Sequence, residues 1–130
     1  MPFSFRKVKI RANDRVFSNY IRTRDHWRCQ YRFKCFGVED YTQNKSSLHC
    51  SHFQKRRKES VRYDDENCDA ACAKCHYFVE NDPNGQKTLE KWKEKQLGSR
   101  RYKALLIRAN STCKRDDKLT KIYLTELIKK

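Results

Sequence analysis

The sequence has few of the aliphatic residues that normally build a protein core. Leu, Ile, Val and Phe account for 25 of the 130 residues, about 19%, while the formal net charge is +15. This combination meets the usual compositional criterion for disorder, so aliphatic burial alone would stabilise a fold weakly. The length suits one domain. We expect extra stability from aromatic residues and from a metal ion bound by some of the seven cysteines.

Long apolar runs are also missing. No segment approaches the roughly 18–20 apolar residues that a membrane-spanning helix needs, so we expect a soluble chain. Met1-Pro2-Phe3 leads directly into alternating basic residues, and the cysteine count is odd. Both features argue against a signal peptide and a secreted disulfide framework. We therefore expect a reducing, cytoplasmic location.

Acidic residues are scarce at both ends of the chain. Residues 1–28 contain eight Lys or Arg against two acids, residues 29–85 contain nine of each, and residues 86–130 contain fourteen against five. A neutral centre between cationic ends suits a chemical site flanked by segments that neutralise nucleic-acid phosphates. A basic surface that only keeps the protein soluble is the alternative. We predict one domain made of a basic arm and helix, a neutral core and a basic helical extension, with these same boundaries.

The apolar pattern predicts a short β-region among several helices. The expected elements, in chain order, are an extended arm over residues 1–11, a helix from Asn13 or Asp14 to about Arg24, a β-hairpin with loops over 27–53, a polar loop over 54–67, a helix over about 72–79 that "NDPNG" ends, a helix ending at Gly98, another around Tyr102 to Ala109, and a last one from about Asp116.

Four of the cysteines have the spacing of a zinc site. Cys72 and Cys75 form a CxxC pair, and such a pair at a turn entering a helix can place both sulfurs about 2.3 Å from one ion. Cys29 and Cys35 are the expected second pair, although five intervening residues exceed the common two to four. Cys68 is a possible substitute ligand. The alternative is that these residues are buried free thiols, which are common in cores.

A second pattern, His52-x14-Asn67-x8-His76, overlaps the CxxC pair. It resembles the HNH endonucleases, whose ββα-metal finger holds one divalent ion against a scissile phosphate. Short flanking segments narrow the resemblance to the phage NinG/Rap recombination endonucleases, from about residue 14 to 98. These segments are "DRVFSNYIRTRD" at 14–25, the first cysteine pair, "SHF" at 51–53, "VRYDDEN" at 61–67, "CAKCH" at 72–76 and "LG" at 97–98.

The resemblance implies a role for each residue of this pattern. His52 would be the general base, since a histidine with an unperturbed pKa of about 6.5 can take a proton from water near neutral pH. His76 would hold one catalytic divalent ion, Mg²⁺ or Mn²⁺, which stabilises charge on the phosphate and the leaving 3′ oxygen. Asn67 would fix the loop through its amide or lend its oxygen to the metal. Products with 5′-phosphate and 3′-hydroxyl ends are expected.

One position departs from the general HNH pattern. Many HNH enzymes have an Asp or His metal ligand directly before the base, whereas this chain has Ser51, as the NinG-like group has a small residue. His49 and Glu80 are candidate replacements, the latter because it lies one helical turn beyond His76. Each could instead be an ordinary surface residue. NinG-like chains often have Asn at the position of His76, so this histidine is closer to the general pattern.

Basic residues follow the predicted base in the loop, as "QKRRK" at 54–58 and Arg62. We predict phosphate contacts without sequence preference from Lys55, Arg56, Arg57 and Arg62, with Arg57 and Arg62 as first choices. A merely solvated charged face is the alternative.

Together these features predict an α+β protein with a ββα-metal finger and a structural zinc, flanked by an N-terminal helix and C-terminal helices. The expected function is DNA hydrolysis by an intracellular phage or bacterial enzyme. The family favours branched recombination intermediates such as Holliday junctions, whose symmetric resolution needs a homodimer. The alternatives are a sequence-specific or nicking HNH endonuclease and a non-catalytic zinc-dependent DNA-binding module. An RNA-processing enzyme is weaker, because no aromatic-rich RNA-binding motif stands out.

Overall fold

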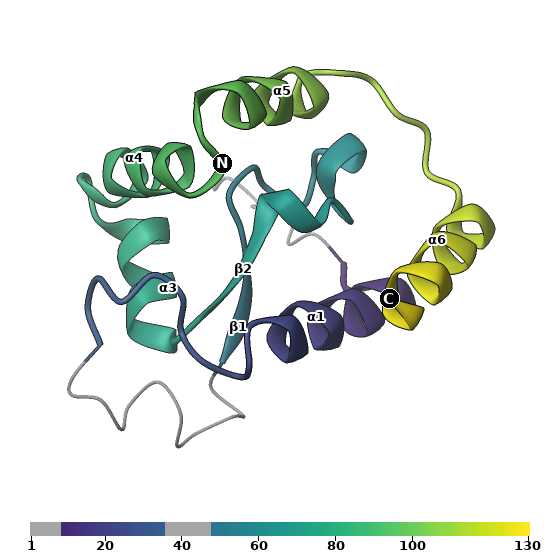
Figure 1. The fold of residues 1–130 in the computed structure, drawn as a ribbon, viewed down its shortest axis with the longest axis horizontal. Helices are drawn as coiled ribbons and strands as arrows, with labels where there is room; N and C mark the ends of the chain where they lie inside the picture. Colours follow the sequence, from purple (N-terminus) through teal and green to yellow (C-terminus); the bar gives the residue numbers. More distant parts are fainter. Residues whose placement is uncertain (1–8, 36–47) are drawn as a thin grey trace, which may run out of the picture.

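A two-stranded antiparallel sheet lies at the centre of the protein (Figure 1). The computed structural model describes residues 9–35 and 48–130. Strand β1 (His49–His52) pairs with β2 (Cys68–Ala71), so that His52 lies opposite Cys68. Five α-helices of the described residues surround the sheet: α1 (Ala12–Arg24), α3 (Ala73–Asn81), α4 (Gly85–Leu97), α5 (Ser99–Ala109) and α6 (Asp117–Lys129). The predicted α+β class is confirmed.

The pairing of β1 differs from the prediction. A hairpin within residues 27–53 was the expectation, but β1 pairs with a strand beyond the 54–67 loop. Residues 27–35 contain no strand, and residues 36–47 lie outside the described residues, as do residues 1–8 of the predicted arm. All four residues of β2 are buried, so this strand has no polar alternation by which its sequence could be recognised.

The 54–67 loop is more ordered than the polar loop that its sequence predicts. It contains two short 3₁₀ helices, η2 (Glu59–Val61) and η3 (Asp65–Asn67). Asp64 caps the second by accepting a hydrogen bond from the N–H of Glu66 at 3.0 Å. The loop therefore leads directly from β1 into β2 with a defined path.

One core lies between the sheet, α1 and α6. Phe17 and Ile21, four residues apart on α1, are both buried, and Leu124 of α6 completes the contact. Asp14 fixes the beginning of α1, because its Oδ2 accepts a hydrogen bond from the N–H of Arg11 at 2.7 Å. The basic N-terminal helix is thus attached firmly next to β1.

Across the described residues, no helix combines the length and the apolar character that crossing a membrane requires.

The other core joins the sheet to α3, α4 and α5, and aromatic residues contribute much of it. Tyr31 packs edge-on against Trp92, with ring centroids 4.8 Å apart. Gly85 begins α4 so close to α3 that a Cβ atom there would overlap the carbonyl oxygen of Phe78. The buried Lys93 of α4 pairs with Asp69 of β2 and donates to the carbonyl of Glu66 at 2.8 Å. These contacts fix α4 against β2 and α3.

Candidate active site and metal centre

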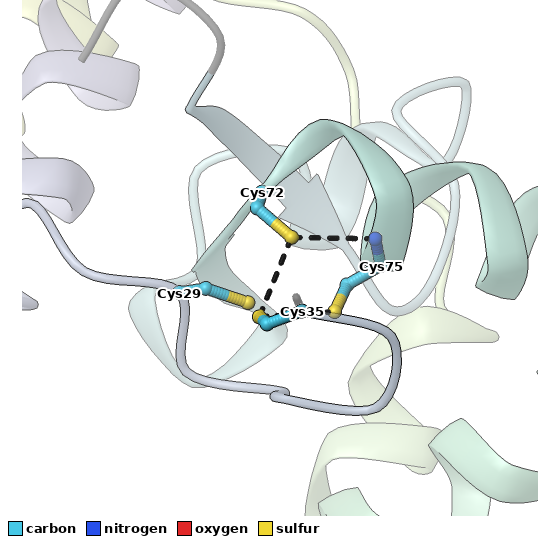
Figure 2. A group of neighbouring side chains, drawn as sticks. All are labelled: Cys29, Cys35, Cys72 and Cys75. Atoms are coloured by element: carbon cyan, nitrogen blue, oxygen red, sulfur yellow. Dashed lines mark hydrogen bonds between the residues drawn. The ribbon is translucent and has the colours of Figure 1, made fainter. Parts of the chain in front are cut away.

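Four cysteine sulfurs meet where α3 begins (Figure 2). The Sγ atoms of Cys29, Cys35, Cys72 and Cys75 all lie within 4.8 Å of one another. The Sγ of Cys35 is 3.5 Å from that of Cys72 and 3.7 Å from that of Cys75. Four sulfurs about 2.3 Å from a central zinc ion would be about 3.8 Å apart in a tetrahedron. The donor set and its spacing fit one zinc ion, and the predicted clustering of these four cysteines is confirmed.

The backbone near the cluster directs N–H groups at the sulfurs. Arg32 has a left-handed conformation (φ 59°), and its N–H donates to the Sγ of Cys29 at 3.5 Å. The N–H of Lys34 donates to the Sγ of Cys75 at 3.3 Å, and the N–H of Cys75 to the Sγ of Cys72 at 3.5 Å. A left-handed non-glycine residue costs roughly 1–2 kcal/mol. The loop adopts this conformation where it wraps around the sulfurs.

The cluster favours one negative charge and resists more. Hydrogen bonding with Cys75 lowers the pKa of Cys29 to about 5. The same bond raises the pKa of Cys75, and burial raises the pKa of Cys35 to about 12. A structural zinc site, in contrast, uses thiolates as ligands. A divalent cation at the centre of the cluster would supply the positive charge that further thiolates need.

A separate cleft of about 1030 Å³ lies next to β1, bordered by α1, α3 and the loop that follows β1. Three of the four histidines in the chain, His49, His52 and His76, line it together with Glu80. Five basic side chains also line it: Arg15, Arg22, Lys55, Arg56 and Arg57. Imidazoles within a basic rim suit an anionic ligand bound next to a cation. The predicted base and the predicted metal ligand therefore share one cavity.

His52, at the end of β1, is oriented by the backbone of the loop. Its Nε2 is 3.0 Å from the carbonyl oxygen of Arg62. A carbonyl only accepts hydrogen bonds, so Nε2 bears the hydrogen and the lone pair of the neutral ring is on Nδ1. Burial lowers the pKa of His52 to about 4, since desolvation disfavours the imidazolium. At pH 7 the ring is neutral and able to accept a proton, as a general base must be.

Asn67 holds the two ends of the loop together. Its Oδ1 accepts from the N–H of Gln54 at 2.8 Å, and its Nδ2 donates to the carbonyls of Gln54 at 2.9 Å and Val61 at 3.1 Å. The side chain is 0% exposed and is not among the residues that line the cleft. These contacts agree with the loop-fixing role and not with metal binding. Asn67 thereby holds Val61, the residue before Arg62, whose carbonyl orients His52.

His49, His76 and Glu80 lie together on the α3 side of the cleft. The rings of His49 and His76 stack with centroids 4.8 Å apart, and the Nε2 of His76 is 3.6 Å from Oε1 of Glu80. Lys55 pairs with the other oxygen of Glu80 at 2.6 Å. Imidazole nitrogen and carboxylate oxygen suit a divalent ion. In the part of the chain that the structure describes, two groups of side chains have their ligand atoms within 4.8 Å of one another, and both consist of other residues. His49, His76 and Glu80 would therefore have to rotate their side chains to bind one ion together.

The residues predicted to bind phosphate divide into two groups. Lys55, Arg56 and Arg57 line the cleft. Arg62 is only 1% exposed. It donates to both carboxylate oxygens of Asp14 and to the backbone carbonyls of Lys9 and Arg56. The prediction that Arg62 contacts DNA is therefore wrong, because its guanidinium joins the loop to α1. Arg15 and Arg22 of α1 were not singled out from the sequence, which indicated only a basic N-terminal region.

Two cysteines lie close to His52. Cys68 is on β2, away from the four-cysteine cluster, so its predicted role as a substitute zinc ligand is wrong. Its sulfur, the sulfur of Cys50 and a ring nitrogen of His52 all lie within 4.8 Å of one another. Strand alternation places Cys50 and His52 on one face of β1, which the sequence could have indicated. The approach of Cys68 depends on the unpredicted pairing with β2.

A smaller cavity of about 590 Å³ lies near η3, α5 and the beginning of α6. Its lining contains no histidine, and two of its carboxylates, Asp64 and Glu66, are paired with Arg108. The chemistry-bearing side chains therefore gather at the cleft beside β1.

Comparison with protein-family models, with curated proteins and with solved structures gives no match for this chain.

Proposed function

We propose that this protein is a metal-dependent DNA endonuclease of the HNH type. The observation that supports it best is the shared cleft, in which a neutral His52 faces the same space as His76 and the basic rim. A phosphodiester entering this cleft would meet a base, a pair of metal ligands and several cations. Each of these is a component that phosphodiester hydrolysis needs.

In this proposal, His52, the basic residues of the cleft and Asn67 have separate roles. His52 takes a proton from the attacking water through Nδ1, while the Arg62 carbonyl keeps Nε2 protonated and the ring in place. The basic residues of the rim, among them Arg57 and Arg15, hold the phosphates of the substrate. Asn67 keeps the loop closed so that this arrangement persists.

His76 and Glu80 are the side chains that would hold the catalytic divalent ion, with His49 as a further ligand. When bound, Mg²⁺ or Mn²⁺ would stabilise negative charge on the phosphate and the leaving 3′ oxygen. Lys55, which pairs with Glu80, would then be released toward the substrate phosphates. Ser51 takes no part, because it is buried and accepts a hydrogen bond from the hydroxyl of Tyr31 at 2.9 Å.

The four-cysteine cluster is the structural zinc site of this proposal. Two of its ligands begin α3, the helix that presents His76, and two belong to the loop after α1. A zinc ion would therefore fix α3 relative to the rest of the molecule. The preferred substrate is a branched DNA intermediate such as a Holliday junction, cut by a homodimer to give 5′-phosphate and 3′-hydroxyl ends. A nicking or sequence-specific endonuclease is the close alternative.

The proposal is tested by plasmid cleavage in Mg²⁺ or Mn²⁺ with matched histidine variants. His52→Asn removes the base and should lower the cleavage rate by about 10²–10⁴-fold. His26→Asn is the control, since His26 is exposed, does not line the cleft and has a left-handed backbone that asparagine tolerates. Equal loss in both variants, or cleavage by neither variant nor parent, would refute the nuclease.

A zinc-dependent DNA-binding module without catalysis is the second candidate. The observation that favours it is Ser51, which occupies the usual ligand position and is committed to Tyr31. A module should bind DNA with the strong salt dependence of phosphate contacts and leave the DNA uncut. Binding by pure parent protein, with no cleavage of linear, nicked or four-way DNA in either metal, would establish it.

A further inference from the structure

Cys50, His52 and Cys68 form a second compact group of metal ligands, separate from the four-cysteine cluster. One atom from each, two sulfurs and a ring nitrogen, lie within 4.8 Å of one another. They sit on the face of the sheet that packs against α1, and Cys50 and His52 also line the cleft. The group therefore has a buried side at Cys68 and an open side toward the cavity.

The strand register indicates a metal site here and not a disulfide. Cys50 lies opposite Ala70 and His52 opposite Cys68, so the two cysteines are diagonal neighbours. Diagonal pairs in an antiparallel sheet have Cα atoms about 7–8 Å apart. A disulfide requires less than about 7 Å, whereas two sulfurs on one zinc ion are about 3.8 Å apart and tolerate the wider spacing of the strands.

The chemistry of the group selects a thiophilic ion. Two sulfurs and an imidazole suit Zn²⁺ and exclude Mg²⁺, which prefers oxygen ligands. Three protein ligands leave a fourth tetrahedral position, and the cleft is the side from which water could fill it. His76 and Glu80, with a carboxylate available, remain the better site for Mg²⁺ or Mn²⁺.

We propose that Cys50, His52 and Cys68 bind an inhibitory zinc ion that switches off hydrolysis. The inhibition rests on the proposed nuclease function, whereas the binding site stands independently. A neutral imidazole has one lone pair available, and a zinc ion on His52 occupies it. The base can then no longer take a proton from water, although the fold, the four-cysteine cluster and the Mg²⁺ ligands are unchanged.

The test loads the full chain with excess zinc and counts the ions that it retains after gel filtration in Mg²⁺ buffer. The parent should retain two zinc ions, while Cys50→Ser and Cys68→Ala should each retain one. Cys113→Ser, which alters an exposed cysteine outside both groups, should retain two. His76→Ala should also retain two zinc ions, because the second ion does not use His76 or Glu80 as a ligand. Far-UV circular dichroism confirms that each variant is folded, and two independent cysteine variants guard against one that fails to fold.

The cleavage assay tests the inhibition separately. The assay starts from protein that carries one zinc ion per chain, and a second equivalent of zinc should reduce Mg²⁺-dependent cleavage by the parent at least tenfold and leave Cys50→Ser nearly unaffected. The proposed second zinc site would be refuted if the parent retained one zinc ion, or if Cys50→Ser and Cys68→Ala both retained two. Loss of the second ion in His76→Ala would also overturn it. A parent that binds two zinc ions but never cuts DNA would retain the site and refute the nuclease function.

Discussion

The Nε2 of His52 lies 3.0 Å from the backbone carbonyl oxygen of Arg62, a residue whose own side chain is buried against Asp14. The orientation of a cleft residue is thus set by a residue of the interior. Val61, next to Arg62, is held in turn by Asn67. The geometry of the candidate base therefore depends on a buried network that connects α1, the loop and β1.

The first prediction concerns the pH dependence of cleavage. Burial lowers the pKa of His52 to about 4, from an ordinary histidine pKa of 6.5. The imidazole therefore stays neutral at pH values well below 6.5. The value of kcat/KM at saturating metal, which reports the free enzyme, should stay flat from pH 8 to about 5.5. Steady-state kinetics at constant ionic strength measures it. A bend near 6.5 would show that the imidazole is open to solvent and the proposed orientation wrong.

The second prediction concerns the buried Arg62–Asp14 ion pair. Asp14→Asn leaves the Arg62 guanidinium without a counter-charge and should lower the free energy of unfolding by about 3–5 kcal/mol, measured by urea denaturation. Asp117→Asn is the control, since it removes an exposed pair with Arg115 and should leave the midpoint nearly unchanged. Similar small effects in both would contradict the role assigned to Arg62.

The same pair predicts a pH dependence of stability. Burial alone would raise the pKa of Asp14, but hydrogen bonds from Arg62 and from the N–H of Arg11 outweigh it and lower the pKa to about 2, from an ordinary 3.8. Ionised Asp14 therefore adds about 2 kcal/mol to the free energy of unfolding above pH 3.8. This stabilisation is lost as the pH falls from 3.8 toward 2 and the carboxylate becomes protonated. Parent and Asp14→Asn stabilities should converge over this range; parallel curves would count against the pair.

The third prediction concerns the structural zinc. Binding of a structural zinc ion contributes on the order of 10 kcal/mol to folding, and the aliphatic core here is small. Chelation, confirmed by metal analysis, should abolish the helical circular dichroism signal, and Cys72→Ser should unfold at much lower urea than Cys113→Ser. An unchanged spectrum after complete metal removal would show that the aromatic and apolar packing suffices alone.

The fourth prediction decides which residue replaces the ligand missing at Ser51. If Glu80 binds the catalytic ion, Glu80→Gln should raise the Mn²⁺ concentration for half-maximal cleavage by about tenfold or more. Glu90→Gln, an exposed glutamate on α4, is the control. An unchanged Mn²⁺ requirement in Glu80→Gln, with a raised one in His49→Ala, would assign the ligand to His49.

The predictable part of this site consists of side chains that are close in the sequence. The CxxC pair and its helix are close in sequence, and the metal donors His76 and Glu80 are one helical turn apart, so their neighbourhood follows from helix geometry. The end of α1 at Arg24 and the stop at Gly98, whose φ is 83°, were also predictable. The predicted beginning of α1 was too late, because Arg11 is the N-cap and Asp14 lies at the third helical position.

Contacts that depend on tertiary pairing were not predictable in this way. The partner of β1 is a buried four-residue strand without alternation, so the sequence could not indicate that Cys68 lies near His52. Arg57 and Arg62 have the same side chain within one basic loop. Only the position of Asp14, 48 residues before Arg62, decides that Arg62 is internal.

The most direct test of the central claim is diffraction from crystals of His52→Asn bound to duplex DNA and Mn²⁺, with the ion located by its anomalous signal. The account predicts one Mn²⁺ on His76, with Glu80 or His49, and a backbone phosphate between that ion and position 52. A Mn²⁺ ion or a phosphate bound only outside the cleft would contradict it.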